Sequence, residues 1–184
     1  VVSKSEEILH AIPSMTFDAR GLGSRKATKK LVEKIKEIKP DIIHLHNIHG
    51  YYLNYEILFK YLFKADIPVV WTFHDCWAMT GHCAHFIDAN CEKWKQGCHH
   101  CPKRNRYPKS FTDFSARNYS LKKSSFKSIN KLLSEDNNDN ITYFKNLSIE
   151  NVTYNKIKNY LFLSRSARSI SRFASRFAAS SRLS

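Results

Sequence analysis

The hydrophobic pattern of residues 24–73 changes twice between a helical and an extended period. Apolar residues first recur at helical spacing, with lysines on the opposite face: Ala27, Leu31, Ile35 and Ile38. Ser24 precedes them as a predicted N-cap. Pro40 is predicted to end this helix, because the residue before a proline avoids helical backbone angles.

Two short apolar runs and a second helix follow. Residues 42–46, IIHLH, and residues 67–73, IPVVWTF, are typical of buried strands. Between them, residues 54–65 repeat apolar side chains at helical spacing: Ile57, Leu58, Tyr61 and Leu62. Helix–strand–helix–strand with short connections indicates a parallel sheet with crossover helices. The predicted fold class is α/β.

The segments on either side are less regular. Residues 1–23 contain a helical turn or two that Pro13 is expected to interrupt, and GLG at 21–23 is a predicted turn. A further helix is predicted over 113–129. Beyond Lys131 the chain is polar and then strongly biased to Ser, Arg, Ala and Phe. We place a boundary near 130 and expect residues 131–184 to be a disordered or helical tail.

Polar residues gather where each predicted strand ends. The first group is His44, His46, Asn47, His49 and Gly50, and the second is His74 and Asp75. Ligands of parallel sheets bind beyond the carboxyl ends of the strands, so adjacent strands would bring both groups to one crevice. The alternative is that His44 and His46 are partly buried packing residues that happen to alternate.

All five cysteines lie between residues 76 and 102. Four of them could together bind a structural zinc ion: Cys83, Cys91, Cys98 and Cys101. The last two form a Cys-x-x-Cys pair. Cys76 is the odd one out, and substitute ligands are available in His82, His85, His99 and His100. The alternatives are buried reduced cysteines without metal, or one or two disulfides. A zinc ion would clamp a long loop over the crevice.

Length, charge and cysteine content limit the number of domains, the kind of partner and the location of the protein. A chain of 184 residues is one domain, or one domain with an appendage. A formal charge of +14 indicates an anionic partner: a membrane surface, a phosphorylated small molecule or nucleic acid. No apolar run approaches the ~20 residues of a membrane-spanning helix. Clustered cysteines in an α/β sequence argue against a secreted disulfide scaffold, so we expect a cytoplasmic location.

Several of these motifs together resemble a known family. PDIIHLHNIHGYYLNYEILFKYL, then PVVWTFHDCWAMTGHCAHF, then C-x6-GC-x2-CP and YPKS resemble the N-terminal half of bacterial glycosyltransferases of family 4, more narrowly those of capsular and exopolysaccharide assembly. The resemblance covers residues 21–130. It implies half of a GT-B fold: a Rossmann-like domain that binds the acceptor and faces a second domain that binds a nucleotide-sugar donor. It also implies a retaining reaction without a catalytic metal, and a saccharide or lipid-linked acceptor.

The resemblance also suggests roles. His46 and Asn47 fall in the strand-end motif that lines the family's cleft, and His74 and Asp75 fall in the next one. We therefore expect catalytic roles for His46 and Asp75. Substrate-binding roles are expected for the other strand-end residues: His44, Asn47, His49, Gly50 and His74. The four cysteines match a cysteine-rich insertion seen in part of the family.

Two departures from the family pattern matter. Its first strand with a glycine-rich loop is not seen, and residues 131–184 do not resemble its donor domain. We therefore expect an incomplete enzyme, inactive alone, with a tail from a shifted or rearranged reading frame. A helical wheel of the tail separates arginines (Arg165, Arg168, Arg172, Arg176) from apolar residues (Leu163, Ile170, Phe173, Phe177), a pattern suited to peripheral contact with the inner membrane.

Two other functions compete. A zinc-stabilised nucleic-acid-binding module would use the +14 charge and the cysteines, but the basic residues are not confined to one face with interleaved aromatics. A nucleophilic enzyme using Cys76 and His74 would place its two groups very close in sequence, with no identifiable oxyanion loop. Both fit less well than glycosyl transfer.

Overall fold

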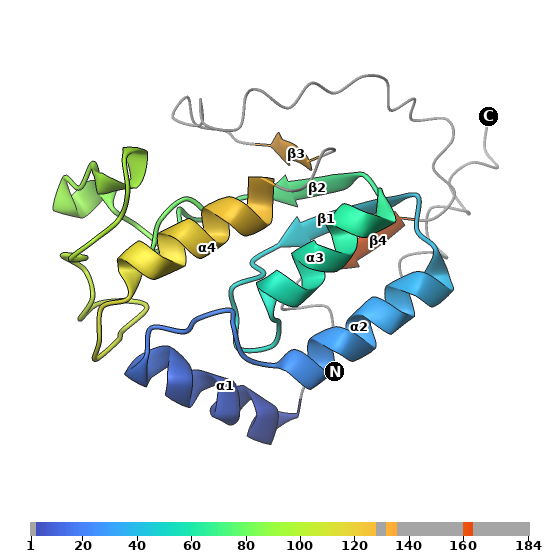
Figure 1. Ribbon diagram of the computed structural model, residues 1–184, viewed down its shortest axis with the longest axis horizontal. Coiled ribbons are helices and arrows are strands. Elements are labelled where there is room, and N and C mark those ends of the chain that lie inside the picture. The colour runs from blue at the N-terminus through green and yellow to red at the C-terminus, as the bar shows by residue number, and fades with distance from the viewer. Residues whose placement is uncertain (1–2, 128–131, 136–159, 164–184) are drawn as a thin grey trace, which may run out of the picture.

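Four parallel strands form one sheet in the computed structural model, which describes residues 3–127, 132–135 and 160–163 (Figure 1). The strand order is β3-β2-β1-β4. The strands are β1 (Ile42–His46), β2 (Val69–Thr72), β3 (Leu132–Glu135) and β4 (Tyr160–Leu163). In β1 and β2, Ile43 pairs with Val69 and His46 with Thr72. This confirms the predicted α/β class and agrees with the Rossmann-like half of a GT-B fold.

Helices α2 (Arg25–Ile38), α3 (Tyr55–Ala65) and α4 (Ser115–Lys127) accompany the sheet, and α3 contacts both of the others (Figure 1). Trp71 of β2 forms the centre of an aromatic core. Its ring lies 5.3 Å from Phe59 of α3 and 4.9 Å from Phe126 of α4. The large buried side chains of β1, β2, α3 and α4 therefore form one core.

Local hydrogen bonds explain where α3 begins and show that the start of α2 is not capped as predicted. The Asn54 side chain accepts a hydrogen bond from Ile57 N–H at 3.0 Å, as an N-cap does. Ser24 marks the start of α2, but it has a left-handed backbone and makes no capping bond. Its hydroxyl donates to the Tyr51 carbonyl at 3.0 Å instead. The start of α2 was predicted correctly, but the capping role of Ser24 was wrong because its hydroxyl is used elsewhere.

The first helix, α1 (Lys4–Thr16), is longer than expected. Ser3 and Glu6 form a capping box at its start. Pro13 lies inside the helix, and Phe17 N–H still bonds to the Pro13 carbonyl at 2.9 Å. The predicted interruption at Pro13 was wrong, because a proline in the last turn removes one hydrogen bond without preventing the next one.

Eight described residues belong to the predicted tail, and they are strands. Strand β3 pairs with β2, and β4 pairs with β1, both in parallel. This differs from the expected disordered or helical tail, because the open edges of β1 and β2 satisfy the backbone groups of a third and a fourth strand. The arginine-rich wheel over 165–177 lies outside the described residues, and the division near 130 stays a prediction. Among the residues described, no helix is long and apolar enough to cross a membrane.

Candidate functional site

The carboxyl ends of β1 and β2 carry side chains that contact one another. His46 Nδ1 lies 2.8 Å from His74 Nε2. His44 Nε2 lies 2.8 Å from the Thr72 hydroxyl, and the His44 and His46 rings are 4.1 Å apart. The expected meeting of the two strand ends is therefore confirmed.

A second pair lies beside the histidines. His49 Nε2 is 3.1 Å from Asp75 Oδ2, and both side chains are largely buried. Burial opposes the charge on Asp75, but hydrogen bonding and attraction to His49, with the Trp77 N–H, outweigh it and lower the pKa of Asp75. The His49 ring also stacks on Trp77 at 5.1 Å. Asp75 is thus a fixed negative charge that holds His49 in one orientation.

A small pocket joins these groups. Its lining includes Asn47, His49, His74 and Asp75, together with Thr72 and four aromatic or small residues of β2 and the following turn. Asn47 has a left-handed backbone with a φ of 43°, and its carbonyl accepts from the Tyr52 hydroxyl. Gly50 is buried and does not line this pocket. Of the predicted residues, Asn47, His49, His74 and Asp75 line the pocket. His44, His46 and Gly50 do not.

His46 is neutral at physiological pH. Burial, with the neighbouring His44 and His74 rings, lowers the pKa of His46 from 6.5 to about 4. A neutral imidazole has one donor and one acceptor nitrogen, and His46 uses Nδ1 for its bond to His74. His74 is exposed and lines the pocket, so it is the ring of this pair that a sugar hydroxyl can reach.

Sequence reasoning missed Arg20, which lies next to this crevice. Its guanidinium donates to the His49 carbonyl at 3.0 Å and to the hydroxyls of Tyr51 and Tyr107. Arg20 is 6% exposed, and no carboxylate of the described residues lies within ion-pair distance of it. It adds an uncompensated positive charge near His49. A single arginine in a weakly patterned segment gives no signal that could have identified it.

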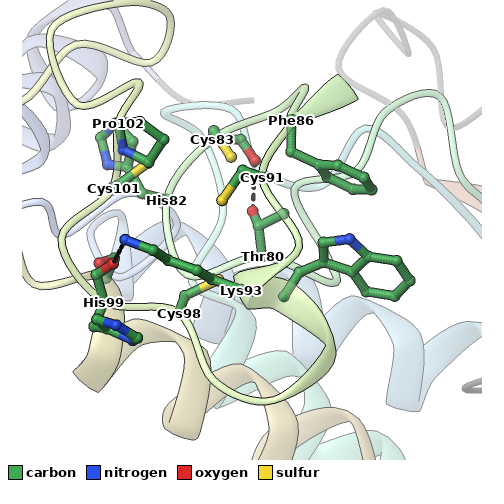
Figure 2. Close-up of a pocket in the computed structure, with 12 residues that line it drawn as sticks. Thr80, His82, Cys83, Phe86, Cys91, Lys93, Cys98, His99, Cys101 and Pro102 are labelled. Carbon is green, nitrogen blue, oxygen red and sulfur yellow. Dashed lines mark hydrogen bonds between the residues drawn. The ribbon is translucent and has the colours of Figure 1, made fainter. Parts of the chain in front are cut away.

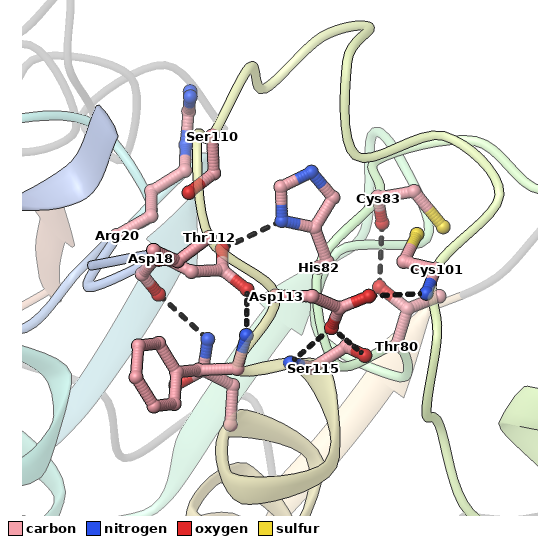
Figure 3. Close-up of polar contacts among 12 residues, drawn as sticks. Asp18, Arg20, Thr80, His82, Cys83, Cys101, Ser110, Thr112, Asp113 and Ser115 are labelled. Carbon is pink, nitrogen blue, oxygen red and sulfur yellow. Dashed lines mark hydrogen bonds and ion pairs between the residues drawn. The ribbon is translucent and has the colours of Figure 1, made fainter. Parts of the chain in front are cut away.

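A buried hydrogen bond connects the cysteine-rich loop to residues near the N-terminus. A dashed line joins His82 and Asp18 in Figure 3. His82 Nδ1 lies 2.6 Å from Asp18 Oδ1, and both side chains are at most 4% exposed. The other Asp18 oxygen accepts from Phe114 N–H at 3.2 Å. His82 Nε2 is buried and has no hydrogen-bond partner among the described residues. Sequence analysis had considered His82 only as a substitute ligand.

The four predicted metal-ligating cysteines line one pocket, together with His82 and His99 (Figure 2). All four cysteines are free thiols. A hydrogen bond from Cys101 lowers the pKa of Cys83, and the same bond raises the pKa of Cys101. Cys76 is not among the lining residues. Within the described ranges, no three His, Cys, Asp or Glu side chains already surround one point as metal ligands do. The loop thus gathers the right donors without a formed metal site.

The chain matches the family model named Glycosyltransferase Family 4 over residues 3–124. The chain belongs to glycosyltransferase family 4. This family 4 chain is 43% identical over 74 residues to a candidate colanic acid biosynthesis glycosyl transferase, WcaC, of Escherichia coli K12. That alignment covers 38% of this chain and 18% of the relative.

The chain therefore spans only a small part of the relative that it matches. No solved structure matches it significantly. Family membership supports glycosyl transfer in general, and the strand-end crevice is the part of this family 4 chain whose geometry suits a sugar ligand.

Proposed function

We propose that the protein carrying this chain transfers a hexosyl group from a nucleotide-sugar to a saccharide or lipid-linked acceptor in polysaccharide assembly. The observation that carries the proposal is the crevice at the ends of β1 and β2. There, His46 contacts His74, and His49 pairs with Asp75. In a family 4 chain, such a crevice is the natural place for the acceptor.

The residues of the crevice have separate tasks in this proposal. Neutral His46 orients the attacking hydroxyl through His74, whose ring lines the pocket and is held by the hydrogen bond to His46. His44 packs against the His46 ring. Asp75 fixes His49 and presents a negative charge near the carbon that becomes positive in the transition state. The reaction retains the configuration of the sugar, and the nucleotide-sugar is bound by a donor domain beyond the described residues.

Arg20 favours an acceptor that carries phosphate. Its buried guanidinium has no carboxylate partner among the described residues. It donates a hydrogen bond to the backbone carbonyl of His49. Phosphate oxygens are the acceptors that a guanidinium binds best. A saccharide linked to a lipid through phosphate would place such oxygens beside its sugar. We accordingly propose a cytoplasmic location, with access to the face of the membrane.

A transfer assay tests the proposed function. The protein that carries this chain is incubated with a panel of UDP- and GDP-hexoses and with membrane lipids from a polysaccharide-producing strain. Labelled sugar is expected to appear in the lipid fraction for one donor. Arg20→Lys is expected to weaken binding of the lipid-linked acceptor and to leave the KM for the nucleotide-sugar unchanged. Absence of transfer for every donor, by a folded protein that binds none of them, would contradict the proposal.

We also propose that the cysteine-rich loop holds a structural zinc ion. Cys83, Cys91, Cys98 and Cys101 would be the ligands, because thiolates are the ligands that structural zinc prefers and these four thiols line one pocket. Their side chains would have to rotate to surround one point. The purified protein should contain about one zinc per chain, and Cys98→Ser should lose it, whereas Cys76→Ser should keep it. A folded protein free of metal would contradict this proposal.

A further inference from the structure

Helix α1 exposes apolar side chains and buries polar ones, the reverse of an ordinary surface helix. His10 and Ser14 are 1% and 4% exposed. On the other side of the helix, three apolar residues are 55–68% exposed: Ile8, Leu9 and Ile12. Residues three and four positions apart share one face, so Met15 continues the same stripe. No described segment of the chain covers these side chains.

A second segment extends the apolar surface. Phe111 N–H donates to the Met15 carbonyl at 2.7 Å, and the Thr112 hydroxyl donates to the Thr16 carbonyl at 2.6 Å. These bonds hold residues 107–114 against the end of α1. We define the α1 patch by its exposed apolar residues: Ile8, Leu9, Ile12, Met15, Phe17, Tyr107, Phe111 and Phe114. Of the other large apolar side chains in the described part of the chain, only Phe63 and Ile87 are as exposed.

Positive charges border the aromatic end of the α1 patch. Lys109 Nζ lies 5.7 Å from the centre of the Phe111 ring, and the Arg117 guanidinium lies 5.9 Å from that of Phe114. Within residues 103–109, KRNRYPK, Lys103 is paired with Asp88, and Arg104 and Arg106 add further cations. Two acidic residues of α1, Glu6 and Glu7, lie in its first turn, away from these cations. The α1 patch therefore combines exposed apolar side chains with a cationic border.

We propose that the α1 patch binds the surface of an anionic lipid bilayer. With 13 residues, α1 is about 20 Å long, too short to span a bilayer, so it would lie in the plane of the interface. Its apolar side chains and the rings of residues 107–114 would enter the headgroup region, and the cations would contact anionic headgroups. A second copy of the chain fits less well, because both copies carry a charge of +14 and would bring their cationic borders together.

Vesicle flotation of the full 184-residue chain tests this proposal. We expect the chain to float with vesicles of phosphatidylcholine containing 30% phosphatidylglycerol, and less with phosphatidylcholine alone. The double variant Ile8→Ser/Ile12→Ser should bind at least tenfold more weakly, because both side chains lose their apolar contact with lipid. The matched control is Ile87→Ser, which removes an equally exposed isoleucine outside the α1 patch and should bind as the wild type does. Lys109→Gln/Arg117→Gln should weaken binding most at low salt.

The variants change outward-facing side chains, so thermal melting should show that all of them fold. Three results would overturn the proposal. The first is a wild-type chain that does not float with anionic vesicles. The second is equal loss of binding in Ile8→Ser/Ile12→Ser and in Ile87→Ser. The third is self-association without lipid that Ile8→Ser/Ile12→Ser abolishes, because the α1 patch would then bind a second copy of the chain.

Discussion

Individual side chains at the strand ends give the most direct test of the crevice. His46→Ala removes the imidazole proposed to orient the acceptor, and Asp75→Asn removes the charge that holds His49. We expect each to lower turnover about a hundredfold in the protein that carries this chain. The free energy of unfolding should fall by no more than about 1 kcal/mol, because polar groups at strand ends serve ligands more than packing.

The control for these variants is His99→Ala, which changes an exposed histidine of the cysteine-rich loop. Turnover is measured by sugar transfer, and stability by urea denaturation. If His46→Ala and Asp75→Asn lose stability and turnover in proportion, the alternative interpretation is right, and the strand-end histidines are packing residues.

His10 makes stability depend on pH. Its Nε2 accepts hydrogen bonds from Gly21 N–H and Gly23 N–H at 3.2 and 3.0 Å, which a protonated ring could not do. Burial lowers the pKa of His10 from 6.5 to about 4. In the unfolded chain His10 is therefore protonated below about pH 6.5, whereas in the folded protein it is protonated only below about pH 4. The contribution of His10 to the free energy of unfolding is fully present above pH 6.5. It is lost as the pH falls from about 6.5 to about 4.

The expected loss from His10 at pH 5 is about 2 kcal/mol, since one pKa unit corresponds to 1.4 kcal/mol. Urea denaturation at pH 7.5 and pH 5 measures it. His10→Gln keeps an acceptor that does not titrate, so the difference between the two pH values should shrink by that amount. His99→Gln, at an exposed position, should leave the difference unchanged. An unchanged difference in His10→Gln would show that His10 is not the titrating group.

Residue patterns identified part of the site and missed the rest for a physical reason. The positions of His46, His74 and Asp75 at the strand ends could be predicted, because the period and the end of a strand depend on residues that are neighbours in the sequence. Arg20 and the Asp18–His82 pair could not, since their partners lie 29 and 64 positions away. A contact at such a separation leaves no periodic trace in one sequence.

At the level of elements, the cysteine-rich loop is anchored to the start of α4 at Gly81. A Cβ added to Gly81 would lie 2.0 Å from the Ser115 carbonyl oxygen and 2.8 Å from Cys98 Cβ. Neither neighbour is the end of a flexible side chain, so the loop or α4 would have to move. Gly81→Ala should therefore lower the free energy of unfolding by about 3 kcal/mol and loosen residues 76–102.

Gly97→Ala provides the comparison for Gly81→Ala. An added methyl group at Gly97 meets open space, but a backbone φ of 154° still disfavours it, so the expected loss is about 1 kcal/mol. Urea denaturation gives both values, and hydrogen exchange reports the loop. Similar losses in the two variants would mean that the close approach at Gly81 does not limit the packing of the loop against α4.

Elements with a strong period were predicted well, and those shaped by other segments were not. The bounds of α3 agree with prediction because Asn54 caps it and apolar residues repeat at helical spacing. Of the predicted inward residues, Leu58 and Leu62 are buried, whereas Ile57 and Tyr61 are half-buried and Phe59 was missed. The exposed face of α1 could not be foreseen, because apolar residues at helical spacing ordinarily mark the buried side. Its burial is reversed by His10, which accepts hydrogen bonds from the backbone at Gly21 and Gly23.

For the molecule as a whole, the sheet includes β3 and β4, and the contribution of these edge strands to stability can be measured. Leu163 of β4 is 6% exposed and belongs to the main core, although it lies beyond the boundary predicted near 130. Leu45 of β1 is its register partner. If β4 is a stable part of the fold, Leu163→Ala should lower the free energy of unfolding by about 2 kcal/mol, the lower range for a buried leucine because β4 is an edge strand.

The matched control is Leu9→Ala, the same substitution at a leucine that is 68% exposed on α1, and it should change stability by less than about 0.5 kcal/mol. Urea denaturation of the full chain measures both variants.

A chain ending at residue 130 should be less stable than the full chain by more than Leu163→Ala costs, because β1 and β2 would each lose a paired strand. If Leu163→Ala and the shortened chain are both as stable as the wild type, the fold ends near 130 and the later residues are an appendage. If both lose stability as expected, residues 132–135 and 160–163 complete the sheet that carries the crevice. A change in β4 can then reach His44 through β1, and a change in β3 can reach Thr72 through β2.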